Sequence, residues 1–175
     1  MRRAALRQTM DGFYAALMAL AALALLASFV SVMLGIVDRQ VGWGLRGLDA
    51  YAGYGIAAAL FLALPGTLQK GEHIRVTLVL QRLPARWRAV LEWWSLAAGV
   101  LLSAMLAGYA VRMVWVSQVT HDISQGSDAT PLWLPQIGMA LGCIGLLVAL
   151  LDSAWSRATG GVFEQASGGE AARVE

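Results

Sequence analysis

Four long runs without a charged residue constrain the fold of this chain more than any other feature. They cover residues 13–37, 50–69, 93–111 and 132–151, and are 25, 20, 19 and 20 residues long. A helix needs about 20 predominantly apolar residues to cross the hydrocarbon core of a bilayer. The runs occupy most of the 175 residues and leave no room for a sizeable soluble domain. The sequence therefore predicts an all-α membrane protein with four transmembrane helices.

The predicted spans divide the chain into a membrane domain and two tails. Residues 1–12 form a short N-terminal tail, residues 13–155 the four-helix membrane domain, and residues 156–175 a C-terminal tail. Within the domain the spans lie at about 13–37, 50–69, 91–112 and 132–151. The last tail is rich in Gly, Ser and Glu, a composition that favours disorder. The first run is too long for the apolar region of a cleaved signal peptide, which is about 7–15 residues.

The basic residues predict the orientation of these spans. Ten of the 13 lie in the two tails and in the stretch from Lys70 to Arg88 between the second and third spans, and the other three, Arg39, Arg46 and Arg112, lie on the opposite side. Basic residues concentrate on the cytoplasmic side of membrane proteins. The sequence thus predicts a multi-pass protein of the bacterial inner membrane with both termini in the cytoplasm. The net charge of +2 is small and the basic residues are spread over the ends of the connections, so the sequence gives no support for nucleic-acid binding.

Small residues recur on one face of three predicted spans. Small side chains let helix backbones approach closely in lipid, where packing replaces the hydrophobic driving force. Two interpretations stay open and are compatible: packing within a four-helix bundle, or docking of a second membrane protein. The residues are Ala21, Ala24, Ser28, Ser31 and Gly35 in the first span, Gly99, Ser103, Ala107 and Ala110 in the third, and Gly138, Gly142 and Gly145 in the fourth.

The second connection, "KGEHIRVTLVLQRLP" (residues 70–84), is the most polar stretch between spans. Apolar residues from Val76 to Trp87 recur at helical spacing, with Arg75, Arg82 and Arg86 on the opposite face, which predicts a short amphipathic helix on the membrane surface. Pro84 is expected to end it and start the third span. The basic face suits anionic lipid or a partner protein. His73 is either a ligand or proton carrier, or an interfacial residue with local hydrogen bonds, and Glu72 is expected to form an ion pair.

The other two connections are expected to face outward. In the first, Asp38 and Arg39 end a helix, and glycines follow. In the third, Thr130 and Pro131 are predicted to be the N-cap and first residue of the fourth helix, with Pro135 in its first turn.

The residue types exclude several functions. None of the four runs contains an ionisable Asp, Glu, Lys, Arg or His, whereas proton and ion paths usually need such groups within the membrane. The two histidines lie in connections on opposite sides, so they cannot ligate a haem in the spans. Cys143 is the single cysteine, which excludes an internal disulfide or a cysteine metal cluster made by this chain alone. We therefore expect no catalytic residue, no metal and no cofactor.

Two motifs resemble a known family. "GEHIRVTLVLQRLP", after two spans, and "TPLWLPQIGMALG", opening the fourth, are similar to the small membrane subunit (DctQ-like) of tripartite ATP-independent periplasmic (TRAP) transporters. Arg39 and "LDAYAGY" (residues 48–54) also fit, and the resemblance covers about residues 11–155. The sequence departs from the family pattern at Thr77 and Ala140, and in having Asp49 as the single acid at the start of the second span.

The resemblance implies a non-enzymatic subunit of a secondary transporter. Its partners would be a large multi-spanning permease that holds the substrate and sodium sites, a periplasmic solute-binding protein, and membrane lipid. The solute would be a carboxylate-bearing acid, and this chain would act as a scaffold. A membrane-anchor subunit of another inner-membrane complex is the alternative. The residues carried over as interface or structural motif are Arg39, Asp49, Gly71, Glu72, His73, Arg75, Pro131, Trp133, Pro135, Gln136, Gly138 and Gly142.

Overall fold

The described part of the chain is built from four long helices. The computed structural model describes residues 2–69 and 84–158. The helices are α1 (Arg2–Val41), α2 (Leu48–Gln69), α4 (Ala85–Val119) and α5 (Trp133–Ala158). Each is long and apolar enough to cross a membrane, which confirms the predicted all-α class with four spans. Most of the predicted amphipathic surface helix falls in residues 70–83 and lies outside the described residues, whereas Arg86 and Trp87 of the same pattern belong to α4.

The helices extend beyond the charge-free runs. α1 has 40 residues and α4 has 35, which at about 1.5 Å per residue exceeds the thickness of a bilayer core of about 30 Å. α4 begins directly after Pro84, as predicted, and the Arg88 N–H donates to the Pro84 carbonyl at 3.1 Å. Charged residues such as Glu92 therefore continue a helix past the end of its apolar stretch.

The start of α5 differs from the prediction. Thr130 and Pro131 are not its N-cap and first residue, because the helix begins at Trp133. Pro131 instead pairs with Ile123 in an isolated antiparallel bridge, flanked by hydrogen bonds from the Ser124 N–H to the Thr130 carbonyl and from the Leu132 N–H to the Asp122 carbonyl. Pairing within the third connection thus holds Pro131 in extended conformation, and Pro135 lies in the first helical turn.

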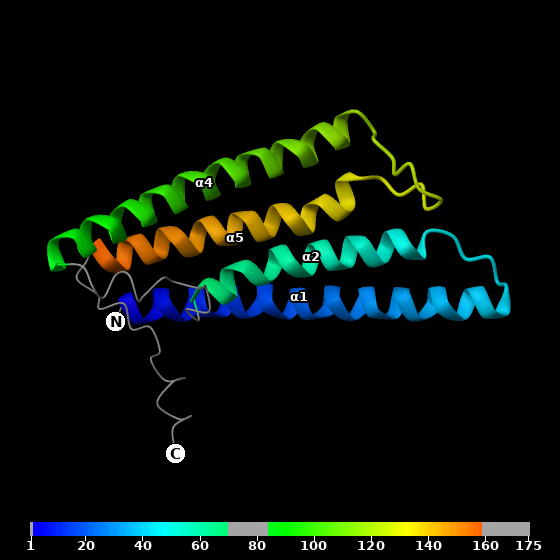
Figure 1. Ribbon diagram of the computed structural model, residues 1–175, viewed down its shortest axis with the longest axis horizontal. Coiled ribbons are helices and arrows are strands. Elements are labelled where there is room, and N and C mark those ends of the chain that lie inside the picture. The colour runs from blue at the N-terminus through cyan, green and yellow to red at the C-terminus, as the bar shows by residue number, and fades with distance from the viewer. Residues whose placement is uncertain (1, 70–83, 159–175) are drawn as a thin grey trace, which may run out of the picture.

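The helices lie side by side in an open row in the order α1, α2, α5, α4 (Figure 1). α2 and α5 run in the same direction in the middle, and α1 and α4 run the opposite way at the two edges. The sequence suggested a bundle, so the arrangement is a correction. α5 is the only helix of the described part that packs substantially against both α2 and α4, and α1 packs mainly against α2.

The predicted small-residue face of α1 packs against α2. Ala21 and Ser28 are buried there, and the Ser28 hydroxyl donates to the Ala52 carbonyl of α2 at 2.8 Å. A Cβ atom added to Gly55 would lie 2.8 Å from the Ala24 carbonyl oxygen. The helices therefore approach so closely at this point that only a glycine fits on α2.

The contact between α2 and α5 is closer still and depends on Gly142. A Cβ atom there would overlap the carbonyl group of Phe61, and one at Gly138 would lie 2.9 Å from the Ala58 Cβ. The Phe61 carbonyl has no helical N–H partner, because Pro65 stands four residues later and has no N–H. Gly142 thus lets the α5 backbone cover a carbonyl that the proline leaves unpaired in its own helix.

α4 packs on the opposite side of α5. Ala107 and Ala110 of α4 form a buried cluster with Ala140 and Cys143 of α5, and Ser103 is buried one turn away. Gly99 lies against the Leu150 side chain. α5 therefore has two tightly packed faces, whereas α1 and α4 each have one small-residue face, which explains why the row does not close.

We expect Gly142→Ala to weaken the fold. The added methyl group overlaps the Phe61 carbonyl, so α2 and α5 must separate, and overpacking of this kind costs about 1–3 kcal/mol. Gly108→Ala is the matched control, because a Cβ atom at Gly108 of α4 meets nothing within 4 Å. Thermal unfolding in mild detergent, followed by circular dichroism, should show a lower midpoint for Gly142→Ala alone. Equal midpoints for the two variants would show that the close contact is not required.

Candidate functional site

The polar side chains that the fold brings together lie at the two ends of the row. At the end that holds the first and third connections, Arg39 in the last turn of α1 forms an ion pair with Asp49 in the first turn of α2, with Nη2 and Oδ2 separated by 3.5 Å. Both side chains are largely exposed to solvent. Exposed pairs contribute about 0–1 kcal/mol, so this pair does more to orient two charges at the surface than to stabilise the fold.

The short connection between α1 and α2 is ordered by its own hydrogen bonds. The Leu45 N–H donates to the Asp38 carboxylate at 3.0 Å, and the Gly42 N–H donates to the Asp38 carbonyl at 2.7 Å. Gly47 has a φ of +81°, and a Cβ atom there would overlap Asp128 of the third connection. Gly47 is thus needed both for its backbone conformation and for the contact between two connections distant in sequence.

Asp128 ties the third connection to α2. Its carboxylate accepts hydrogen bonds from the Ser124 hydroxyl at 2.8 Å and from the Tyr54 hydroxyl at 3.1 Å. Nearby, the Thr130 hydroxyl donates to the Tyr51 hydroxyl at 3.2 Å. We call Gly47, Tyr51, Tyr54, Ser124, Asp128 and Thr130 the outer polar cluster. It joins the first and third connections into one surface, and its name refers to the side that the sequence predicts for them.

The charge of Asp128 is favoured by this environment. Desolvation alone would raise the pKa of the carboxyl, but hydrogen bonds, including those from the Ser124 and Tyr54 hydroxyls, hold the pKa below the ordinary value of 3.8. Asp128 is therefore ionised at neutral pH and accepts hydrogen bonds on both oxygens.

The second sequence motif surrounds the start of α5. Pro131 forms the bridge with Ile123, Trp133 opens the helix, and Pro135 and Gln136 follow in its first turn. The Gln136 N–H donates to the Leu132 carbonyl at 3.3 Å. Its side-chain Oε1 is buried and has no hydrogen-bond donor within the part of the chain that the structure describes. The motif therefore shapes the entry into α5 next to the outer polar cluster.

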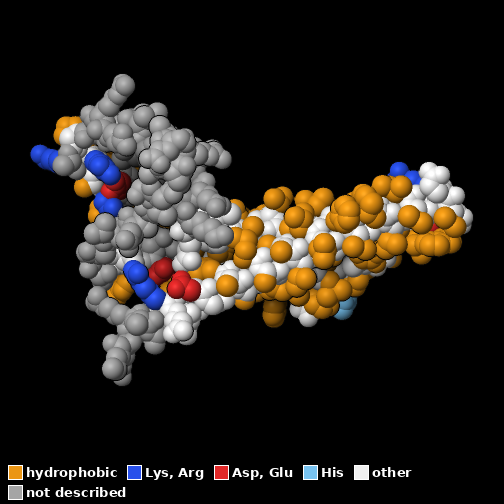
Figure 2. Space-filling view, turned by 90° about the horizontal axis from the view of Figure 1, so that it is seen from below, with side chains coloured by type: hydrophobic (Ala, Val, Ile, Leu, Met, Phe, Trp, Pro, Cys, Tyr) orange, Lys and Arg blue, Asp and Glu red, His pale blue; other side chains and the backbone are white. Residues whose placement is uncertain are grey.

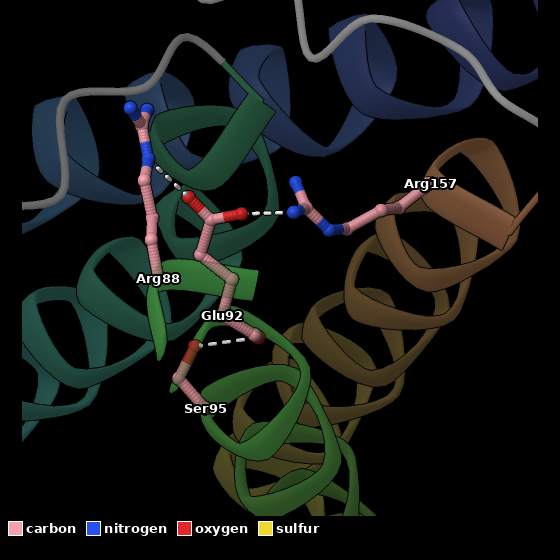
Figure 3. A network of polar contacts seen from close by, with 4 residues as sticks. All are labelled: Arg88, Glu92, Ser95 and Arg157. Atoms are coloured by element: carbon pink, nitrogen blue, oxygen red, sulfur yellow. Dashed lines mark hydrogen bonds and ion pairs between the residues drawn. The ribbon is translucent and has the colours of Figure 1, made fainter. Parts of the chain in front are cut away.

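At the opposite end, an ionic network joins α4 to α5 (Figure 3). The Glu92 carboxylate accepts a hydrogen bond from Arg88 Nε at 3.1 Å on one oxygen and from Arg157 Nη2 on the other. The Ser95 hydroxyl donates to the Glu92 carbonyl at 2.9 Å. The Glu92 and Arg157 side chains are each about three-quarters buried, whereas Arg88 is more than half exposed. Glu92 thus connects the first turns of α4 to the last turn of α5.

The remaining motif residues divide into two groups. Gly138 and Gly142 face α2 within the chain, as described above. Gly71, Glu72, His73 and Arg75 lie outside the described residues. The structure thus brings Arg39 together with Asp49, and places Pro131, Trp133, Pro135 and Gln136 in one segment.

Sequence reasoning missed the residues that make the most polar contacts. Glu92 directly precedes one charge-free run and Arg157 follows another by six residues, on the same predicted side and with opposite charge, and that pattern could have indicated the pair. Asp128 is one polar residue among many in its connection, and nothing in the sequence indicated its contact with Gly47.

The arrangement suits binding better than catalysis. Within residues 2–69 and 84–158, no three His, Cys, Asp or Glu side chains lie together in a way that could hold a metal ion. The polar groups pair with one another across helices and connections. They hold surfaces in place at the two ends of an apolar row.

Comparison with known proteins identifies one family. The family model for the DctQ component of tripartite ATP-independent periplasmic transporters matches residues 28–160, which is more than half of the chain. No curated protein and no solved structure matches the chain significantly.

We expect Glu92→Gln to destabilise the protein by about 1–3 kcal/mol, because it leaves the largely buried Arg157 guanidinium without its charged partner. Arg88→Gln is the control and should cost less than about 0.5 kcal/mol, because its pair with Glu92 is an exposed contact within one helix. Thermal unfolding in detergent measures both. Similar losses for the two variants would contradict the assignment of Arg157 as the important partner.

We expect Asp128→Asn to remove a pH-dependent part of the stability. Because folding lowers the pKa of Asp128, its contribution is fully present above the ordinary value of 3.8 and is lost as the pH falls through the lower folded value. The variant should therefore unfold at a lower temperature than the wild type at about pH 6, and the difference should shrink towards about pH 3. Asp122→Asn, an exposed carboxylate of the same connection, is the control. A wild-type-to-variant difference that stays constant with pH would count against this account.

Proposed function

Because the chain belongs to the DctQ component family of the tripartite ATP-independent periplasmic transporters, of which it is the small component, we propose that it is a non-catalytic scaffold for the large permease subunit. The large subunit would carry the sodium-coupled transport step. The solute would be a carboxylate-bearing acid delivered by a periplasmic binding protein. The protein is multi-pass, and we propose that it lies in the bacterial inner membrane with both termini in the cytoplasm.

The main support for this proposal is that Asp, Glu, Lys, Arg and His are absent from the four charge-free runs. A path for sodium or a carboxylate through the membrane needs polar or charged groups at depth, and such groups in spans mark ion and substrate paths. Residues 13–37, 50–69, 93–111 and 132–151 contain no Asp, Glu, Lys, Arg or His. The chain therefore has little with which to bind a charged solute at depth, and the transport site belongs on another subunit.

The packing of the row supports a static role. Neighbouring helices meet through small residues, and backbone approaches backbone at Gly55 and Gly142. Such contacts allow little sliding, because a neighbouring larger side chain would have to enter the same space. A subunit of this kind suits the fixed part of a transporter.

The outward end supports a contact with the binding protein. The outer polar cluster holds the two outward connections as one surface, and exposed Trp43, Leu45 and Arg46 lie on it beside the pair of Arg39 and Asp49. The distribution of basic residues, ten against three, supports placing this end in the periplasm.

Reconstitution tests the proposal. The partners are first identified by pull-down of the tagged chain in mild detergent, followed by mass spectrometry. We expect a large multi-spanning permease in near-equal amount. Proteoliposomes that contain this chain alone should then show no sodium-driven uptake of a radiolabelled carboxylate. Liposomes with this chain, the permease and the binding protein should show uptake. Sodium-driven uptake by the isolated chain, or recovery of a soluble enzyme in place of a permease, would overturn the proposal.

A further inference from the structure

The exposed side of α4 has a tryptophan towards each end of its apolar stretch. Trp94 and Trp115 lie on one stripe of the helix, and their side chains are 72% and 68% exposed. The stripe between them contains Leu101 and Met105, which are also more than half exposed. Trp94 and Trp115 are 21 residues apart, which at about 1.5 Å per residue is about 32 Å along the helix. This separation matches the hydrocarbon thickness of a bilayer, about 30 Å.

The charges near these tryptophans complement a lipid surface. Tryptophan prefers the two membrane–water interfaces, where its ring is apolar and its N–H meets water. Arg86 and Arg88 precede Trp94 at the inner end, where anionic headgroups attract cations. Arg112 lies one turn before Trp115 and is exposed, so its long side chain can reach the outer headgroups. The exposed side of α4 thus has the aromatic and cationic ends of a lipid-facing helix.

The exposed side of α1 differs in its aromatic residues, whereas exposed arginines lie towards the ends of both helices, Arg7 and Arg39 in the case of α1. Between residues 13 and 37 its exposed side chains include no tryptophan, tyrosine or charged residue. Figure 2, which views the molecule from the α1 side, shows hydrophobic side chains along its length and charged side chains at the ends. This side also contains an apolar groove of about 510 Å³ between α1 and α2, lined by Ala22, Leu25, Leu26, Ser28, Phe29 and Ile56.

The groove is lined almost entirely by apolar atoms. The Ser28 hydroxyl already donates a hydrogen bond to the Ala52 carbonyl, so its hydrogen is not available to a partner. Helices associate in membranes through close packing of such surfaces. A shallow apolar concavity near the middle of α1 suits the side chains of an apolar helix on a partner protein.

We propose that the α4 edge of the row faces lipid and that an apolar helix of the large permease subunit docks on the α1 edge, over this groove. The proposal rests on the proposed scaffold function. It adds that one edge of the row is the subunit interface and the opposite edge is the membrane boundary.

Matched bulky substitutions test the assignment in the co-expressed complex. Ala22→Trp fills the groove from an exposed position, and Ala104→Trp places the same side chain on the exposed side of α4. We expect Ala22→Trp to reduce the permease that co-purifies with the chain by about tenfold or more, and Ala104→Trp to leave it unchanged. Circular dichroism of both variants checks that the helices form. A loss with Ala104→Trp alone, or with neither variant, would overturn the inference.

Photo-crosslinking gives an independent result. A benzoylphenylalanine placed at Leu26 should form an adduct with the permease, and one placed at Leu102 of α4 should not. A Leu26 adduct with a second copy of this chain, or adducts with the permease from Leu102, would overturn the edge assignment. If the wild-type chain recovers no permease at all, the proposed function fails. If it recovers permease but the adducts come from Leu102, only the edge assignment fails.

Discussion

The close contact between α2 and α5 is the constraint on which the rest of the structure depends. Pro65 removes one hydrogen bond inside α2 and leaves the Phe61 carbonyl without a helical partner, a cost that lipid cannot relieve. Gly142 brings the α5 backbone over that carbonyl. Weak C–H···O contacts of this kind recur where helices cross closely. The contact fixes α5 beside α2, and α5 in turn places α4, because α4 packs on its other side.

The middle and the ends of the row are held together by different forces. At mid-depth the surrounding lipid is as apolar as the side chains, so small residues such as Gly55, Gly142 and Ala107 allow close packing. At the ends, where water is near, charged and polar groups join elements that are distant in sequence. Glu92 joins α4 to α5 at one end, and Asp128 joins α2 to the third connection at the other. Each end is therefore held by a carboxylate that accepts hydrogen bonds from two neighbours.

Much of this architecture was predictable from the sequence, and the exceptions have physical causes. Charge-free runs predicted four spans because lipid excludes charges, and the periodicity of small residues predicted the packing face of α1, where Ser28 is buried. The order of the helices in the row was not predictable, because a face of small residues can pack against any other such face. Thr130 and Pro131 have the residue types of a helix start, but pairing with the strand-like segment around Ile123 prevails over that local preference. The contact of Asp128 with Gly47 joins residues 81 apart, and no local pattern marks it.

The same contacts limit how the row can move. If α5 shifted along α2 by one residue and also turned by about 100° about its own axis, Leu141 or Cys143 would replace Gly142 beside the Phe61 carbonyl, where even one methyl group does not fit. A slide would also separate Ala140 and Cys143 from Ala107 and Ala110 of α4, since all four form one buried cluster. Motion of α5 thus costs packing on two sides. A subunit that is packed in this way can remain fixed while a partner subunit moves against it. This supports the proposal that the transport step takes place in the permease.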